Sequence, residues 1–197
     1  MIIGIDPGIA NCGFALWPNR LAYTIKTPAT WTTSQRLDHL WRHLEAIVAN
    51  ARLYNPESGV RVVIEDFITT RKMRGAGGVH RVIGVFQLGL KKLGVDVVLV
   101  KPRQWLQGLG VQGSGHKVDT MALVRQLGWV NVDQHAADAA GLVEWWLCTE
   151  TESTSDTAKR KDTTNEANKA ASNKSGKSKA TANGRRKRVR KQRNKKV

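Results

Sequence analysis

Four polar side chains lie where apolar segments of the sequence begin or end. Asp6 closes the run IIGID and precedes Pro7-Gly8, and Glu65 closes the run VRVVIE. His135 and Asp138 are three residues apart in a predicted helix, so they share one face of it. An ionised carboxylate at the edge of a core is costly unless it is paired with a cation or bound to a metal ion. Since no basic residue adjoins Asp6 or Glu65 in the sequence, these positions are candidates for such chemistry.

Each of these residues, taken alone, also has an ordinary structural explanation. An Asp before Pro-Gly is typical of a turn, and a Glu after a β-branched run can mark where a strand meets solvent. Asp133 is placed to cap the predicted helix, and an Asp in its first turns would suit the helix dipole. A functional interpretation therefore requires that the fold bring the separate segments together.

The elements that must position these residues are predicted from apolar periodicity and turn signals. Strands are expected at residues 2–6, 12–17, 21–26, 60–64 and 95–100. Helices are expected at about 33–53, 79–93, 103–109, 116–127 and 134–147, the first capped by Thr33 or Ser34. Three strands followed by alternating helices and strands indicate an α/β fold, with a mixed sheet covered by helices.

Charge and composition divide the chain into two parts. The net charge is +16, and residues 151–197 hold 16 Lys/Arg against 4 Asp/Glu, which leaves 16 Lys/Arg and 12 Asp/Glu for the rest. We predict a globular domain at residues 1–148 and a disordered Lys/Arg-rich tail at residues 149–197. A basic tail without bulky apolar residues favours nucleic acid over a membrane as its partner.

Other features bear on location. Cys12 and Cys148 are far apart and are expected to be free thiols in a reducing compartment. The sequence opens without a signal-peptide pattern, and no apolar run approaches the roughly 20 residues that span a bilayer. We expect a cytoplasmic protein of a bacterial or phage-infected cell; in a eukaryotic host, RRKRVRK can direct nuclear import.

Three motifs, in order, resemble those of the RuvC-type Holliday junction resolvases in the ribonuclease H-like superfamily. IIGIDPGIANCGFAL is similar to the first-strand motif of that family, VVIEDF to its central acidic motif and HAADAAGL to its final-helix motif. GSGHKVDTMALVRQL is similar to the glycine-and-lysine segment that precedes the last motif. The resemblance covers residues 1–147. It implies a ribonuclease H-like fold with a five-stranded mixed sheet, three antiparallel strands and then parallel ones.

The same resemblance implies an endonuclease that cuts four-way or other branched DNA and leaves 5′-phosphate ends. Asp6, Glu65, His135 and Asp138 would be both catalytic and metal-binding, holding two Mg²⁺ ions, for which Mn²⁺ can substitute. Asp6 would bridge the two ions, with Glu65 on one side and His135 and Asp138 on the other. Ions on the order of 4 Å apart would stabilise the attacking water and the leaving 3′ oxygen.

The histidine leaves two roles open. Many relatives carry Asp at the position of His135, so this residue is either a ligand or the group that orients or deprotonates the water. Asp133 is the alternative ligand if His135 points away. Asp66 should face away from Glu65 and is not counted as a ligand.

Contacts with DNA are expected from basic residues and from one aromatic residue. The candidates are Arg71, Lys72, Arg74, Lys101, Arg103, His116, Lys117 and Phe67. The resemblance places Lys117 near the scissile phosphate and Phe67 against unstacked bases. The alternative for Lys117 is an ordinary exposed lysine, and the alternative for residues 71–78 is a solvated surface loop. The tail would act as a nonspecific DNA tether.

The resemblance further implies a homodimer formed through the helix at 79–93. Core packing alone would also explain the apolar residues of this helix, Val82, Val85, Phe86 and Leu90. Two alternatives to junction resolution remain open. The chain can act on RNA–DNA hybrids or nick DNA with weak selectivity, or it can bind DNA without catalysis.

Overall fold

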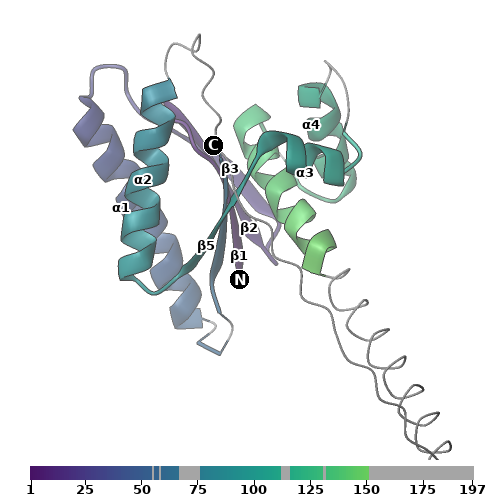
Figure 1. Ribbon diagram of the computed structural model, residues 1–197, viewed down its shortest axis with the longest axis horizontal. Helices are drawn as coiled ribbons and strands as arrows, with labels where there is room; N and C mark the ends of the chain where they lie inside the picture. Colours follow the sequence, from purple (N-terminus) through teal and green to yellow (C-terminus); the bar gives the residue numbers. More distant parts are fainter. Residues whose placement is uncertain (55, 58, 67–75, 112–115, 131, 151–197) are drawn as a thin grey trace, which may run out of the picture. The chain divides into compact units, whose positions relative to one another are not determined.

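Figure 1 shows a computed structural model of the chain, which describes residues 1–54, 56–57, 59–66, 76–111, 116–130 and 132–150. All of these residues belong to one compact unit, Met1–Ser153. The predicted tail lies outside the described residues except for Thr149 and Glu150, which are helical and so differ from the predicted disorder at these two positions. The described helices include none that is long and apolar enough to cross a membrane.

Five strands and five helices are formed by the described residues. The strands are β1 (Ile2–Asp6), β2 (Asn11–Trp17), β3 (Leu21–Lys26), β4 (Arg61–Glu65) and β5 (Asp96–Val100). The labelled helices are α1 (Thr33–Tyr54), α2 (Ala76–Lys92), α3 (Pro102–Gly108) and α4 (His116–Gln126). A further helix at residues 134–150 is called here the alanine-rich helix.

The strands form one sheet in the order β3-β2-β1-β4-β5. β1 pairs with β2, and β2 with β3, in antiparallel fashion, whereas β1–β4 and β4–β5 are parallel. The predicted five-stranded mixed sheet is thus confirmed. The carboxyl ends of β1, β3, β4 and β5 all lie at one edge of the sheet, because these four strands run in the same direction.

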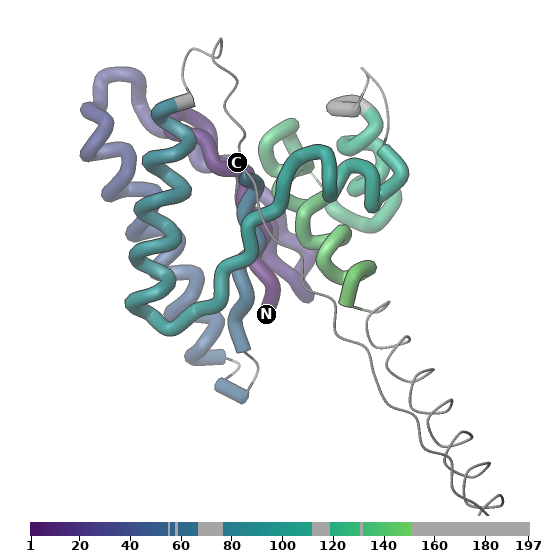
Figure 2. The backbone as a smooth tube through the Cα atoms, viewed as in Figure 1, coloured from purple at the N-terminus to yellow at the C-terminus, as the bar shows by residue number. Residues whose placement is uncertain are grey.

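Helices cover both faces of the sheet (Figures 1 and 2). α1 and α2 lie on one face over large buried side chains, among them Ile3, Ile5, Phe14 and Ile64. The alanine-rich helix lies on the other face, with α3 and α4 beside it. Side chains of successive strand residues alternate between the faces, so one set of strands serves both layers.

Two helix starts differ from the sequence prediction. Thr32 caps α1, not Thr33 or Ser34: its hydroxyl accepts a hydrogen bond from the Gln35 backbone (3.3 Å), and the Gln35 side chain accepts one from the Thr32 backbone (2.8 Å). This reciprocal pair is a capping box, which has Glu or Gln three residues after the cap, here Gln35. α2 begins at Ala76 rather than near residue 79, because the Gly77-Gly78 pair, which resembles a loop in sequence, lies inside its first turn.

Candidate active site

Asp6 and Glu65 lie side by side at the carboxyl ends of two neighbouring parallel strands. Ile5 of β1 is in register with Ile64 of β4, so the next residue of each strand is at the same level. Both isoleucines are fully buried toward α1 and α2. Because side chains alternate along a strand, Asp6 and Glu65 therefore face the opposite side, where the alanine-rich helix lies.

The alanine-rich helix touches the sheet with its backbone. A Cβ atom on Gly13 would lie 2.0 Å from the carbonyl oxygen of His135, and one on Gly4 would lie 2.2 Å from that of Ala139. No side chain fits at either position, so glycine is what allows this approach. Since Gly13 is paired with Asp6 across β1 and β2, the contact sets His135 directly beside Asp6.

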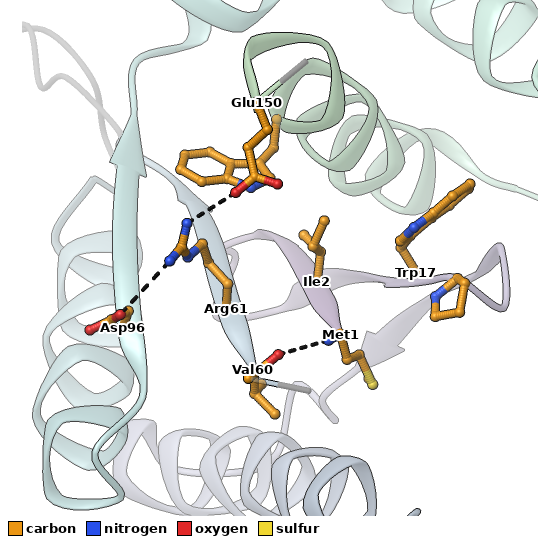
Figure 3. Close-up of a pocket in the computed structure, with 10 residues that line it drawn as sticks. Met1, Ile2, Trp17, Val60, Arg61, Asp96 and Glu150 are labelled. Carbon is orange, nitrogen blue, oxygen red and sulfur yellow. Dashed lines mark hydrogen bonds and ion pairs between the residues drawn. The ribbon is translucent and has the colours of Figure 1, made fainter. Parts of the chain in front are cut away.

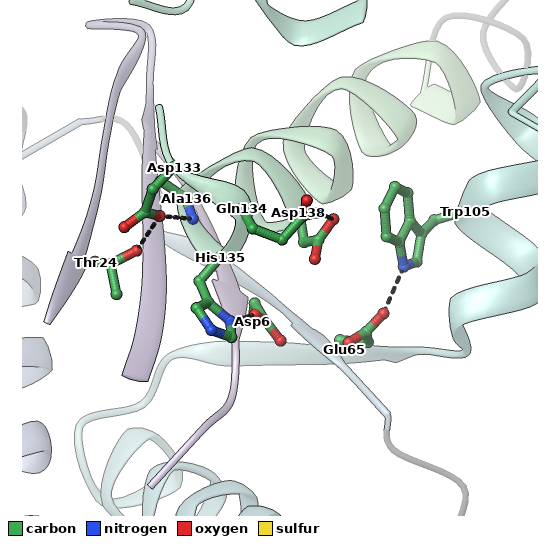
Figure 4. Close-up of polar contacts among 9 residues, drawn as sticks. All are labelled: Asp6, Thr24, Glu65, Trp105, Asp133, Gln134, His135, Ala136 and Asp138. Atoms are coloured by element: carbon green, nitrogen blue, oxygen red, sulfur yellow. Dashed lines mark hydrogen bonds and ion pairs between the residues drawn. The ribbon is translucent and has the colours of Figure 1, made fainter. Parts of the chain in front are cut away.

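The imidazole of His135 contacts the Asp6 carboxylate. Nδ1 lies 2.6 Å from Oδ2 of Asp6, whose side chain is 15% exposed (Figure 4). The hydrogen bond that His135 donates to Asp6 raises the pKa of His135 above its usual value, against the opposing effect of burial. The charges of Asp6, Asp133 and Asp138 act in the same direction. The histidine therefore points into the carboxylate cluster, a position that suits either of its two predicted roles, metal ligand or base.

Glu65 lies in an environment that disfavours its ionised form. Its burial, and then the charge of Asp6, raise the pKa of Glu65 to about 8, with a smaller contribution from Asp138. One contact opposes this: Nε1 of Trp105 in α3 donates a hydrogen bond to Oε1 of Glu65 (3.0 Å) (Figure 4). A buried carboxyl beside two other carboxylates is the arrangement expected where positive charge is to be bound.

Asp138 and Asp133 take different parts in the helix start. Asp138 accepts a hydrogen bond from the Gln134 side chain (2.9 Å) and faces the cluster together with His135 (Figure 4). Asp133 caps the helix by accepting from the Ala136 backbone (3.0 Å), and it also accepts from the Thr24 hydroxyl (2.5 Å). The alternative ligand is thus engaged as a cap.

The side chains of the cluster are of the types that bind a divalent cation. Among the described residues, no group of three or more His, Cys, Asp or Glu side chains already surrounds a single point closely enough to hold an ion. Each carboxylate instead accepts a hydrogen bond from a different side chain: Asp6 from His135, Glu65 from Trp105 and Asp138 from Gln134. Three carboxylates and one imidazole form an oxygen-rich set of the kind that Mg²⁺ and Mn²⁺ prefer. A cation would also relieve the charge repulsion that acts on Glu65.

Basic residues flank this edge of the sheet. Lys101 and Arg103 are exposed immediately after β5, as predicted. Lys26 is exposed at the carboxyl end of β3, but the sequence analysis did not name it as a DNA contact. It could have been found in the same way as Lys101, because both lysines lie where a strand of the same direction ends. His116 and Lys117 are in the first turn of α4, but their side chains lie outside the described parts, as do Phe67, Arg71, Lys72 and Arg74.

The opposite end of the sheet has a cavity of about 620 Å³ with a different character (Figure 3). Arg61, in its wall, forms ion pairs with Glu150 (3.1 Å) and with Asp96 (3.9 Å) and lies over the Trp146 ring. Together with the amino terminus of Met1, Arg61 matches the two carboxylates of this wall. At the carboxyl edge, by contrast, three carboxylates (Asp6, Glu65 and Asp138) meet one imidazole. We therefore place the candidate active site at the carboxyl edge.

A family model and individual relatives point to the same protein family. The family model described as crossover junction endodeoxyribonuclease RuvC matches residues 2–146. Crossover junction endodeoxyribonuclease RuvC of Heliobacterium modesticaldum is 34% identical over 134 residues, 64% of this chain and 79% of that protein. Its counterpart in Rhodococcus opacus is 27% identical over 155 residues, 75% of this chain and 79% of that protein.

Solved structures share the fold. A Thermus thermophilus RuvC structure matches with a TM-score of 0.58 at 22% identity, covering 76% of this chain and 96% of that one. T. thermophilus RuvC in complex with a Holliday junction substrate matches with a TM-score of 0.53 at 20% identity, covering 72% and 88%.

Proposed function

The chain belongs to the RuvC family of crossover junction endodeoxyribonucleases, and on this basis we propose that it resolves four-way DNA junctions by metal-dependent hydrolysis of phosphodiester bonds. One observation carries the proposal. Asp6, Glu65, His135 and Asp138 come from three separate elements and meet at the carboxyl edge of β1 and β4. Family membership favours junction cleavage over action on RNA–DNA hybrids and over DNA binding without catalysis.

We propose that these four side chains hold two Mg²⁺ ions. Asp6 is central, since it contacts His135 on one side and adjoins Glu65 on the other. Bound ions would activate the attacking water and stabilise the leaving 3′ oxygen. Glu65 must be ionised to bind a cation, and the Trp105 hydrogen bond favours that state.

His135 is suited to handle a proton. With Nδ1 against Asp6, Nε2 is the one ring nitrogen left. It can bind an ion or, as the alternative to that role, accept a proton from water, but not both. The Asp6 contact raises the pKa of the imidazole, which makes its neutral form a stronger base. The contact also fixes the ring, as a base that must meet one water molecule requires.

DNA would be held at the same edge. Lys26 lies on one side of the carboxylates, and Lys101 and Arg103 lie on the other, so cations flank the reactive centre on both sides. Such residues contact phosphates and give affinity without sequence information. We assign the same role to the predicted residues outside the described parts.

We also propose a homodimer, because two symmetric strands of a junction call for two sites related by a two-fold axis. Val82, Phe86 and Leu90 are fully buried in the core of their own chain and are not available to a partner. A dimer through α2 must therefore use its outer surface, where Leu88 is 60% exposed.

A competition assay tests the proposal. A four-way junction, a linear duplex and an RNA–DNA hybrid of matched sequence are offered at one salt concentration, with Mg²⁺ or with chelator. We expect Mg²⁺-dependent cuts in the junction and little turnover of the other two. Equal cleavage of duplex or hybrid would contradict junction resolution, and binding without turnover in Mg²⁺ would identify a noncatalytic protein.

A further inference from the structure

Trp105 is fixed at the side of the active site by the core. Its side chain is 2% exposed and packs with Val63, Val100 and Leu142. The ring also lies against the backbone of the alanine-rich helix: a Cβ atom on Gly141 would be 2.7 Å from its Cζ3 atom. The indole therefore occupies one place between β5, β4 and this helix.

From that place the indole N–H reaches one carboxylate oxygen. Nε1 donates to Oε1 of Glu65 at 3.0 Å, across 40 residues of sequence. An indole N–H only donates, so it is a partner for the ionised carboxylate and fixes which oxygen faces α3. Gly141 lies three residues after Asp138, so the surface that seats the ring belongs to the helix that supplies the other half of the cluster.

We propose that Trp105 is a positioning residue for Glu65: by holding Oε1 it orients the buried carboxylate toward Asp6, and thereby raises the affinity of the site for a divalent cation. The inference rests on the proposed function, because it requires Glu65 to be a metal ligand. Groups that orient metal ligands commonly change metal affinity by about 10- to 100-fold when they are removed.

The chain offers a matched control. Trp129, which is fully buried, donates its indole N–H to Glu144 (2.8 Å) on the same helix. Glu144 is 8% exposed and is not one of the proposed metal ligands. Trp105→Phe and Trp129→Phe therefore each remove one buried Trp–Glu hydrogen bond, but only the first acts on the candidate site.

The experiment is a titration of the full-length protein with Mn²⁺ alone, in which free Mn²⁺ is measured by electron paramagnetic resonance. Asp6→Asn defines the binding that does not belong to the site. We expect Trp105→Phe to weaken the site-specific Mn²⁺ affinity by about 10- to 100-fold and Trp129→Phe to leave it unchanged, with thermal unfolding checked for both. In a Glu65→Gln background, Trp105→Phe should have no further effect.

The outcomes distinguish an error in the proposed metal site from an error in the role of Trp105. If the wild-type protein binds Mn²⁺ no better than Asp6→Asn, the proposed metal site is wrong and the inference falls with it. If the wild type binds and Trp105→Phe binds equally well, only the role of Trp105 is overturned. Should Trp105→Phe fail to fold, Gly141→Ala displaces the ring while keeping the indole. Reduced Mn²⁺ affinity in that variant supports the role, and wild-type affinity refutes it.

Discussion

β1 and β2 present different side chains to the two faces of the sheet. Ile3, Ile5 and Phe14 point toward α1 and α2, whereas Gly4 and Gly13 point toward the alanine-rich helix. Large side chains bury apolar area, each contributing about 1.5–3 kcal/mol, but they keep a helix backbone at a distance from the strands. Glycines contribute little burial and let the backbone touch.

The two faces of the sheet therefore contribute differently to the stability of the fold and to the candidate active site. On the glycine side, contact between the helix and the strands sets His135 and Asp138 within reach of Asp6 and Glu65. The buried side chains between the other face and α1 and α2 form one apolar cluster. We infer that the α1/α2 face mainly stabilises the fold and that the opposite face mainly positions the site.

The most damaging change should be Gly13→Ala. Its Cβ would meet the His135 carbonyl at 2.0 Å, so the helix must shift or the protein must unfold. We expect a loss of more than about 3 kcal/mol in the free energy of unfolding and loss of cleavage, measured by denaturation and junction assays. Gly59→Ala, whose Cβ would meet nothing within 4 Å, is the control. Equal stability of the two variants would refute the close contact.

On the other face, Leu44→Ala should cost stability without altering the chemistry. Leu44 is fully buried in α1, and its truncation is expected to cost about 2–5 kcal/mol. Junction cleavage per folded molecule, measured well below the melting temperature, should match that of the wild type. A reduced rate in the fully folded variant would show that the two faces are not separable in this way.

Glu65→Gln should stabilise the metal-free protein while removing its activity. The unfolded chain releases the Glu65 proton near its ordinary pKa, but the folded protein holds it up to a pKa of about 8. Between these values the unfolded state binds fewer protons, so the free energy of unfolding falls as pH rises. His135, whose pKa is also raised, adds a decline of the same sign above its ordinary pKa.

The measurement is urea unfolding in chelator at pH 5 and pH 8. We expect Glu65→Gln to gain about 1–3 kcal/mol at pH 8 and much less at pH 5. An equal effect at both pH values would show that the charge of Glu65 is not the cause.

The smallest effect is expected for the basic residues at the shared edge. Lys26→Ala and Lys101→Ala should each weaken junction binding by less than about 1 kcal/mol and lower the dependence of log K on log salt by about one. Lys91→Ala, an exposed lysine in the last turn of α2, should leave both unchanged. If all three variants behave alike, the DNA does not lie along the edge proposed here.

Much of this fold follows from local patterns. Apolar runs and turn residues predict all five strands, and the order of elements predicts the mixed sheet, because crossover connections make parallel neighbours. Asp6 and Glu65 come together for the same reason, since both end strands of one direction. His135 and Asp138 were placed by motif resemblance, and the fold brings them to the same edge.

The contacts that hold the site were not predictable in this way. Trp105 and Glu65 are 40 residues apart, and Thr24 and Asp133 are 109 apart. Such partners depend on side-chain packing across layers, for which sequence periodicity carries no signal. Gly4 and Gly13 are visible in the first motif, but their role appears only once the helix carbonyls lie against them.

We propose that Asp6 is the central residue of a metal-dependent nuclease site. The direct measurement compares junction cleavage and junction binding in Mg²⁺ for wild type, Asp6→Asn and Asp66→Asn, the last being a carboxylate that is not among the proposed ligands. We predict that Asp6→Asn binds the junction but cuts it at least about a thousandfold more slowly, since metal ions supply several kcal/mol of transition-state stabilisation. Asp66→Asn should cut normally. Wild-type cleavage by Asp6→Asn would contradict this role of Asp6.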